Sequence, residues 1–303
     1  MSGLLSDEPR VGYIGKAEYA GPSRPPTRAA PSPGLWASER GSASLVPMNV
    51  ERAMVIFAHP DDAEFGTAGT VASWARSGIE VAYVCVTDGS AGSNEPGVVR
   101  EELAEIRMAE QRAACDVLGV EDLTIVGIQD GYVELTLDLR RALTREVRRF
   151  RPDVLVAPDP TRYWHDSRSY INHIDHRTVG QACMAVANPD SSTRPMFPEL
   201  LAEGFEPHEL PYLWIGTFGA EADTYIDITE TIETKIEALR CHKSQIHDWP
   251  VDEWIRDRAR ERAEGHGFEY AEAFKTFKLR EREEERRQAD EASAGDSGGQ
   301  GRG

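Results

Sequence analysis

The feature that most constrains the fold is a regular alternation of short, uninterrupted apolar runs with longer segments of helical periodicity. Apolar runs of this length are typical of strands that are buried on both faces of a sheet. They lie at 53–58, 80–87, 123–127 and 153–158. The segments that follow them are predicted to be helices, at 66–78, 99–118, 137–150 and about 174–187.

Strands and helices that alternate at this spacing are joined by right-handed crossovers, and the strands therefore run mostly parallel. Two further strands are predicted at 212–218 and 224–229, and a helix is predicted from about 230 to 243. The expected fold class is α/β, a Rossmann-like three-layer sandwich with a mostly parallel sheet and helices on both faces.

Composition marks the boundaries of this domain, which is expected to span 48–280. Residues 1–47 are rich in Pro, Gly and Ser and lack sustained periodicity, which predicts a flexible extension. Met48 is the first residue of this domain, so the sequence leaves open whether 1–47 belong to the natural protein. Residues 281–303 are a charged run that fades into Gly and Ser, which predicts a disordered tail.

Charge and cysteine usage exclude several classes of partner and location. The 303 residues include 34 basic and 52 acidic side chains, so the formal net charge of −18 argues against nucleic acid as a partner. No apolar run approaches the roughly 18–20 residues that span a bilayer, so no membrane span is expected. The four cysteines form no Cys-x-x-Cys pair and lie in apolar segments, which favours a cytoplasmic location.

Charged residues gather where the first apolar run ends. That run is followed at once by His59, Asp61, Asp62 and Glu64. In an open α/β sheet, ligands bind outside the carboxyl ends of the strands, where this turn is expected. The turn lacks the Gly-x-Gly-x-x-Gly pattern of dinucleotide-binding folds, so dinucleotide binding loses its main support. An imidazole and a carboxylate three residues apart instead provide half of a metal site.

The other half follows the fourth predicted strand, in "NHIDH" at 172–176. His173 and His176 share a face if a helix begins here. Two histidines and one carboxylate match open zinc sites in which water takes a remaining position, and Fe(II) or Co(II) accept the same donors. Each cluster alone also fits a helix start, with Asp62 as the N-terminal cap. Because both clusters follow strands of one predicted sheet, a metal site is the stronger interpretation.

"AHPDDAEFGTAGTVA", read together with "NHIDH", resembles the LmbE-like, or PIG-L, family of zinc-dependent deacetylases. This family includes the N-acetylglucosaminyl-phosphatidylinositol de-N-acetylases and the deacetylases of bacillithiol and mycothiol synthesis. The resemblance covers about residues 53–277, and "TDGSAG", "IRMAEQRAACDVLG" and "KIEALRCHKSQ" support it. It implies a zinc-dependent enzyme that hydrolyses a linear C–N amide bond. Family members often assemble, so a homo-oligomer is compatible with it.

Carried over position by position, the resemblance implies three metal ligands and three catalytic residues. The implied metal ligands are His59, Asp62 and His176. Asp61 would be the general base that deprotonates the bound water. His173 would stabilise the oxyanion that forms as the acetamide carbonyl becomes tetrahedral. Asp175 lies where the family has a carboxylate that orients a histidine.

The residues expected to contact the substrate are Arg107, Thr87, Asp88 and Tyr170. The resemblance places Arg107 where the family contacts substrate hydroxyls or phosphate, but it also fits an exposed helix charge that pairs with Glu105 or Glu110. Tyr170 belongs to an aromatic stretch that fits either stacking on a sugar ring or local packing.

The expected function is removal of an acetyl group from an N-acetylated sugar or related small molecule, so the expected partner is a small acetylated amino sugar or glycoside. Two alternatives stay open. One is an amidase that acts on a larger amide such as a thiol conjugate, and the other is a metal-binding homologue without turnover. The motifs indicate the reaction class and leave the substrate open.

Overall fold

The computed structural model describes residues 36–38, 50–164, 169–217 and 221–280. By its contacts the chain divides into two units, 1–30 and 31–303, of which the first lies outside the described residues. The extension predicted at 1–47 lies outside them as well, apart from the short strand β1 (Trp36–Ser38). So does the tail predicted at 281–303.

The described residues form an eight-stranded sheet in the order β1-β7-β8-β6-β5-β2-β3-β4. The parallel strands are β2 (Arg52–Phe57), β3 (Glu80–Thr87), β4 (Asp122–Ile128), β5 (Val154–Pro158) and β6 (Tyr212–Gly216). The strands β7 (Thr224–Asp227) and β8 (Ala271–Lys278) extend the sheet in antiparallel fashion, and β1 pairs with β7. The predicted mostly parallel sheet is confirmed.

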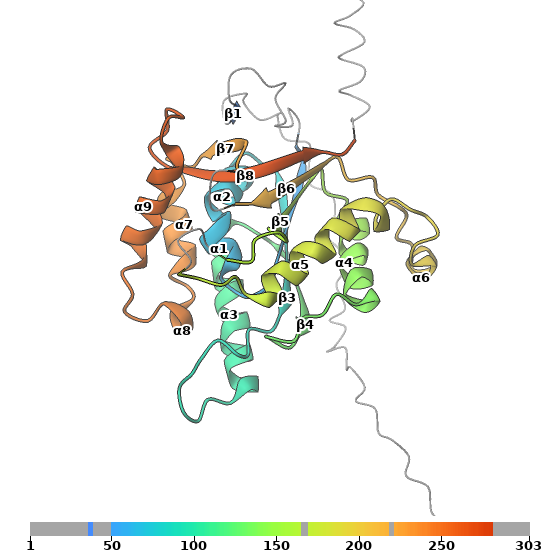
Figure 1. Cartoon of the computed structure of the whole chain (residues 1–303), viewed down its shortest axis with the longest axis horizontal. Helices are drawn as coiled ribbons and strands as arrows, with labels where there is room; N and C mark the ends of the chain where they lie inside the picture. Colours follow the sequence, from blue (N-terminus) through green and yellow to red (C-terminus); the bar gives the residue numbers. More distant parts are fainter. Residues whose placement is uncertain (1–35, 39–49, 165–168, 218–220, 281–303) are drawn as a thin grey trace, which may run out of the picture. The chain divides into compact units, whose positions relative to one another are not determined.

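Helices cover both faces of this sheet (Figure 1). One face carries α1 (Asp62–Gly66), α2 (Ala68–Arg76), α3 (Arg100–Leu118), α7 (Ile232–Leu239) and α9 (Val251–Ala263). The other face carries α4 (Leu137–Phe150) and α5 (Ile174–Ala185). Alternate residues of β2 pack into the two cores, Val55 and Phe57 into one, Met54 and Ile56 into the other. The predicted three-layer α/β sandwich is confirmed.

Several elements differ from the predictions. The helix predicted at 66–78 is two helices, α1 and α2, which are separated at Thr67. The helix predicted at about 174–187 ends at Ala185 and continues into an irregular helical segment, η1 (Val186–Asp190). The elements that were not predicted are β1, α6 (Pro198–Ala202), α8 (Lys243–Ile246), α9 and β8.

A buried ion pair accounts for the separation of α1 from α2. The Glu272 carboxylate on β8 accepts the backbone N–H groups of Gly69 and Thr70, at 3.0 and 2.8 Å, and so caps the first turn of α2. Lys235 on α7 donates to Glu272 at 2.6 Å and to the carbonyl oxygen of Phe65, at the end of α1, at 3.0 Å. Burial lowers the pKa of Lys235, and the Glu272 carboxylate opposes that shift. The pair therefore fixes α1, which begins at Asp62.

Replacing Glu272 with glutamine is expected to lower the free energy of unfolding by roughly 3–5 kcal/mol, because it leaves the buried Lys235 without its counter-charge. Chemical denaturation measures the loss. The matched control is Glu269→Gln, a substitution at an exposed position two residues before β8, which should stay within about 0.5 kcal/mol of wild type. Equal denaturation midpoints for the two variants would show that the buried pair does not stabilise this region.

Candidate active site

The predicted site residues come together at the carboxyl ends of the parallel strands, where β2 lies between β3 and β5. The chain runs from β2 to β3 and β4 on one side, and then returns to β5 on the other. Ligands bind at such switch points in open α/β sheets. The turn after β2 carries His59 and Asp61, His173 precedes α5, and Asp175 and His176 lie in the first turn of α5.

His59, Asp62 and His176 form a compact set of metal-binding atoms. The His59 Nδ1 atom lies 3.1 Å from His176 Nε2 and 3.5 Å from an Asp62 oxygen. The second Asp62 oxygen lies 3.1 Å from His176 Nε2. Tetrahedral zinc with bonds of about 2.0–2.1 Å holds its ligand atoms about 3.4 Å apart, so these residues fit a metal of that size. The predicted ligands are thus gathered around one point.

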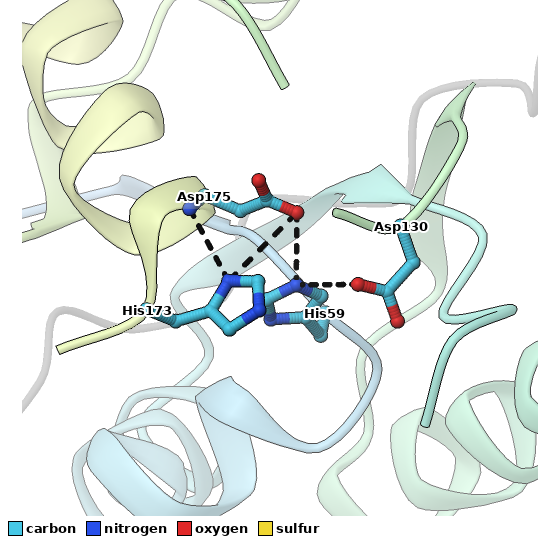
Figure 2. Close-up of side chains that lie close together, drawn as sticks. All are labelled: His59, Asp130, His173 and Asp175. Atoms are coloured by element: carbon cyan, nitrogen blue, oxygen red, sulfur yellow. Dashed lines mark hydrogen bonds and ion pairs between the residues drawn. The ribbon is translucent and has the colours of Figure 1, made fainter. Parts of the chain in front are cut away.

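The opposite nitrogen of His59 faces two carboxylates (Figure 2). Its Nε2 atom lies 3.1 Å from an Asp130 oxygen and 3.2 Å from an Asp175 oxygen. The same Asp175 oxygen accepts the backbone N–H of Gly131 at 2.8 Å. These contacts place the ring proton on Nε2 and leave the lone pair of Nδ1 for a metal. Asp130 and Asp175 therefore orient the His59 ring. The family resemblance implies an orienting role for Asp175 alone, and that role in metal binding stays a prediction.

A second set of potential metal-binding atoms comprises His59, Asp130, His173 and Asp175. It shares His59 with the first set, but uses the Nε2 atom that the two carboxylates already occupy. A histidine ring that binds metal through one nitrogen ordinarily donates the other N–H to a carboxylate. The two sets therefore fit a single candidate metal site, in which Asp130 and Asp175 would support His59 by hydrogen bonds.

The carboxylates give this centre a strongly negative field. Burial opposes a charge on His59, but hydrogen bonds with Asp130 and Asp175 and the charge of Asp62 raise its pKa to about 12. Burial likewise opposes ionisation of Asp62, yet His176 and His59 hold its pKa well below its usual range. The same field favours a divalent cation between the three ligands, and metal binding would displace a proton from the site.

Asp61 lies next to the predicted metal ligands and has a different environment. Burial and the neighbouring Asp62 carboxylate raise the pKa of Asp61 to about 7, against the lowering effect of Arg107. A general base is most effective when its pKa lies near the working pH. Arg107 donates to an Asp61 oxygen at 3.1 Å and to the carbonyl oxygens of Pro60 and Gly89.

Arg107 is buried, with 3% of its surface exposed. The alternative of an exposed helix charge paired with Glu105 or Glu110 is therefore wrong, because its hydrogen bonds go to the turn after β2 and to Gly89. The structure places Arg107 behind Asp61, where its positive charge orients the carboxylate. A contact between Arg107 and a substrate stays a prediction.

His173 caps the first turn of α5 from the side of the metal centre. Its Nδ1 atom accepts the backbone N–H of Asp175 at 3.2 Å, so the ring proton of neutral His173 lies on Nε2. The ring packs edge-on against His59 with centroids 4.7 Å apart, and the side chain is 42% exposed. An N–H donor beside the metal centre suits stabilisation of an oxyanion.

The other predicted substrate residues differ in exposure. Thr87 is fully buried and its hydroxyl accepts the backbone N–H of Gly89 at 3.3 Å, so its side chain has no surface to offer a substrate. Asp88 accepts the backbone N–H groups of Ser90 and Asp130 at 2.9 and 3.1 Å, and so forms the turn that positions Asp130. Tyr170 is 54% exposed on the loop before His173, where a substrate can reach it.

Sequence reasoning missed Asp130, although its position carried a signal. Asp130 follows β4 in "IQDGY", at the same edge of the sheet as the two recognised clusters. It also missed the buried partners of Glu64, which are Gln111 and His242. Their signal is weaker, because a single polar residue in a helix, or just before one, does not reveal which strand end it reaches.

Replacing Asp130 with asparagine is expected to weaken metal affinity by about 10–100-fold, the usual effect of losing a carboxylate that orients a histidine ligand. Competition with a chromogenic chelator measures it. Glu134→Gln, at an exposed position of the same loop, is the matched control and should retain wild-type affinity. Unchanged affinity in Asp130→Asn would remove this residue from the metal centre.

Comparison with known proteins agrees with this geometry. Residues 54–187 match the family described as "PIG-L: GlcNAc-PI de-N-acetylase". A diacetylchitobiose deacetylase from Thermococcus kodakarensis is 31% identical over 209 residues, which cover 68% of this chain and 73% of that protein. A probable N-acetyl-alpha-D-glucosaminyl L-malate deacetylase 2 from Bacillus anthracis is 28% identical, with 65% of this chain and 82% of that protein covered.

A solved structure has a similar fold. The N,N'-diacetylchitobiose deacetylase from Pyrococcus horikoshii, in complex with an inhibitor, superposes with a TM-score of 0.70 at 29% sequence identity. The match covers 76% of this chain and 84% of that one. With the fold, the clustered histidines and carboxylates and these relatives in agreement, the chain belongs to the PIG-L family of GlcNAc-PI de-N-acetylases, the LmbE-like deacetylases.

Proposed function

We propose that this protein is a metal-dependent hydrolase that removes the acetyl group from an N-acetylated amino sugar or its glycoside. The observation that carries the proposal is the placement of Asp61 and His173 beside the compact His59–Asp62–His176 set. That arrangement supplies a base and a hydrogen-bond donor next to a metal centre. The related proteins described above are named as deacetylases of N-acetylated sugars.

The chain's own residues account for the movement of protons in amide hydrolysis. A bound metal would supply a Lewis acid and a water of lowered pKa. Asp61 takes a proton from the attacking water as the oxygen of that water forms a bond with the acetyl carbon. The Nε2–H of His173 hydrogen-bonds to the carbonyl oxygen as that oxygen gains negative charge. The C–N bond then breaks, the nitrogen receives the proton that Asp61 took from the water, and acetate and a free amine are released.

We propose zinc as the metal. Two imidazole nitrogens and a carboxylate are the usual donors of catalytic zinc, and the spacing of the ligand atoms suits it. Iron(II) and cobalt(II) accept the same donors, and both belong in any metal screen. Magnesium is disfavoured because it prefers oxygen ligands.

Exposed aromatic side chains on the loops of the site support a sugar as the substrate. Tyr170 and Tyr132 are 54% and 64% exposed and lie on the loops that carry His173 and Asp130. Exposed aromatic rings of this kind stack on sugar faces. No helix in the described ranges is long and apolar enough to cross a membrane. All four cysteines are free, which supports the proposed cytoplasmic location.

The direct test is product analysis with zinc-loaded protein and N-acetylglucosamine, N,N'-diacetylchitobiose and N-acetylglucosaminides as candidate substrates. Release of acetate with an equal amount of free amine is the expected result. A larger acid released from an N-acyl conjugate, without acetate, would favour the amidase alternative. Metal binding without any product across the panel would favour a non-catalytic homologue and contradict the proposal.

A further inference from the structure

The backbone of Asp61 adopts a conformation that residues other than glycine rarely adopt. Its φ and ψ angles are 103° and −24°, in the left-handed region. Strain of this kind persists only where the surrounding structure holds it, and it concentrates at active sites. The conformation sets the direction of the carboxylate of the proposed general base. The groups that hold the backbone of Asp61 in this conformation therefore affect catalysis.

Helix α3 holds this turn through two residues that lie one helical turn apart on its buried face. Gln111 accepts the backbone N–H of Asp61 through Oε1 at 3.1 Å. Arg107 donates to the Asp61 carboxylate at 3.1 Å and to the carbonyl oxygen of Pro60. Arg107 therefore fixes the side chain of Asp61, and Gln111 fixes its backbone.

The amide of Gln111 has one favourable orientation. Its Nε2 group donates to Glu64 Oε1 at 3.0 Å, while the other Glu64 oxygen lies 3.2 Å from His242 Nε2. The side chains of Gln111, Glu64 and His242 have no exposed surface. A flipped amide would place its oxygen against the Glu64 carboxylate and its N–H against the N–H of Asp61. Glu64 therefore selects the orientation that accepts from Asp61.

We propose that Gln111 is a positioning residue for catalysis, which holds Asp61 in its left-handed conformation and is itself oriented by the buried Glu64–His242 pair. The proposal rests on the proposed function in so far as Asp61 is the base. Loss of the Gln111 acceptor frees the Asp61 N–H, allows the backbone to relax and moves the carboxylate away from the reacting water. Substrate binding and the three metal ligands are not altered directly.

The experiment uses the full-length, zinc-loaded chain with Gln111→Met, which keeps side-chain length and removes both polar atoms. The rate of amide hydrogen exchange at Asp61 measures how firmly its backbone N–H is held, and this measurement does not require enzymatic activity. Loss of one hydrogen bond is expected to speed that exchange about tenfold, with β2 amides unchanged. The expected kinetic effect is a fall in kcat of about 100-fold with KM within about threefold, as for a reacting group misplaced by an ångström.

The matched control is Arg112→Met, an exposed position on the same helix, which should change neither measurement. If Gln111→Met does not fold, Gln111→Asn takes its place, since it is too short to bridge Asp61 and Glu64. Unchanged exchange at Asp61 in the folded variant would overturn the proposal, as would faster exchange with wild-type kcat. If the proposed function is wrong, the wild-type protein releases no acetate. The exchange rate at Asp61 would still show whether Gln111 holds its backbone.

Discussion

Replacing Asp61 with asparagine is expected to lower kcat for acetate release by about 10²–10⁴-fold, the range that general acid–base catalysis contributes. Asparagine keeps the size of the side chain and an oxygen that can accept from Arg107, but it cannot take a proton from water. The three metal ligands are untouched, so the variant should bind as much zinc as wild type. Steady-state kinetics and metal analysis of the same preparation measure both effects.

The control for this experiment is Asp116→Asn, which makes the same chemical change at an exposed position of α3. It should retain wild-type kinetics and zinc content. Wild-type hydrolysis by Asp61→Asn would exclude Asp61 as the base. A loss of zinc in parallel with activity would instead assign Asp61 to the metal centre.

Replacing His176 with alanine is expected to abolish stoichiometric zinc binding and, with it, acetate release. His176 Nε2 lies 3.1 Å from both His59 Nδ1 and an Asp62 oxygen, so its loss removes one of three donors. Loss of a supporting carboxylate alone weakens a metal site by about 10–100-fold, and loss of a ligand should weaken it more. Metal analysis after dialysis, together with product analysis, measures the effect.

The matched control is His266→Ala, which removes a histidine that stacks on Tyr225, 3.6 Å between ring centroids, on a different part of the sheet. It should keep both zinc and activity. Retention of stoichiometric zinc by His176→Ala would show that the metal lies elsewhere, and retention of activity without zinc would contradict a metal-dependent reaction.

The sequence predicted the parts of the fold that depend on local pattern. Uninterrupted apolar runs marked β2 and β3 because strands covered on both faces need apolar side chains in both directions. It did not predict β8, whose stretch AEAFKTFK places charged residues among apolar ones. Glu272 in that strand is buried only because Lys235 and the first turn of α2 meet it there. These contacts join residues that are far apart in the sequence, so no local pattern predicts them.

The candidate site was predictable where its residues are close in sequence. The clusters around His59 and His176 can each be recognised from local spacing after a predicted strand. The parallel topology of the sheet brings the two clusters together. Asp130 and Gln111 reach the site singly from other elements, so Asp130 carries only the signal of its position after a strand, and Gln111 carries none. Thr87 was predicted to contact the substrate because it lies at a strand end. Its hydroxyl instead accepts a hydrogen bond within the turn that follows the strand.

The most direct test of the central claim is a zinc titration of metal-free protein, with the rate of acetate release measured after each addition. If His59, Asp62 and His176 hold the metal that hydrolysis requires, activity should start near zero, rise linearly and level off at one zinc ion per chain. A metal-free protein that is already fully active would contradict this account. So would activity that no amount of zinc, iron(II) or cobalt(II) restores.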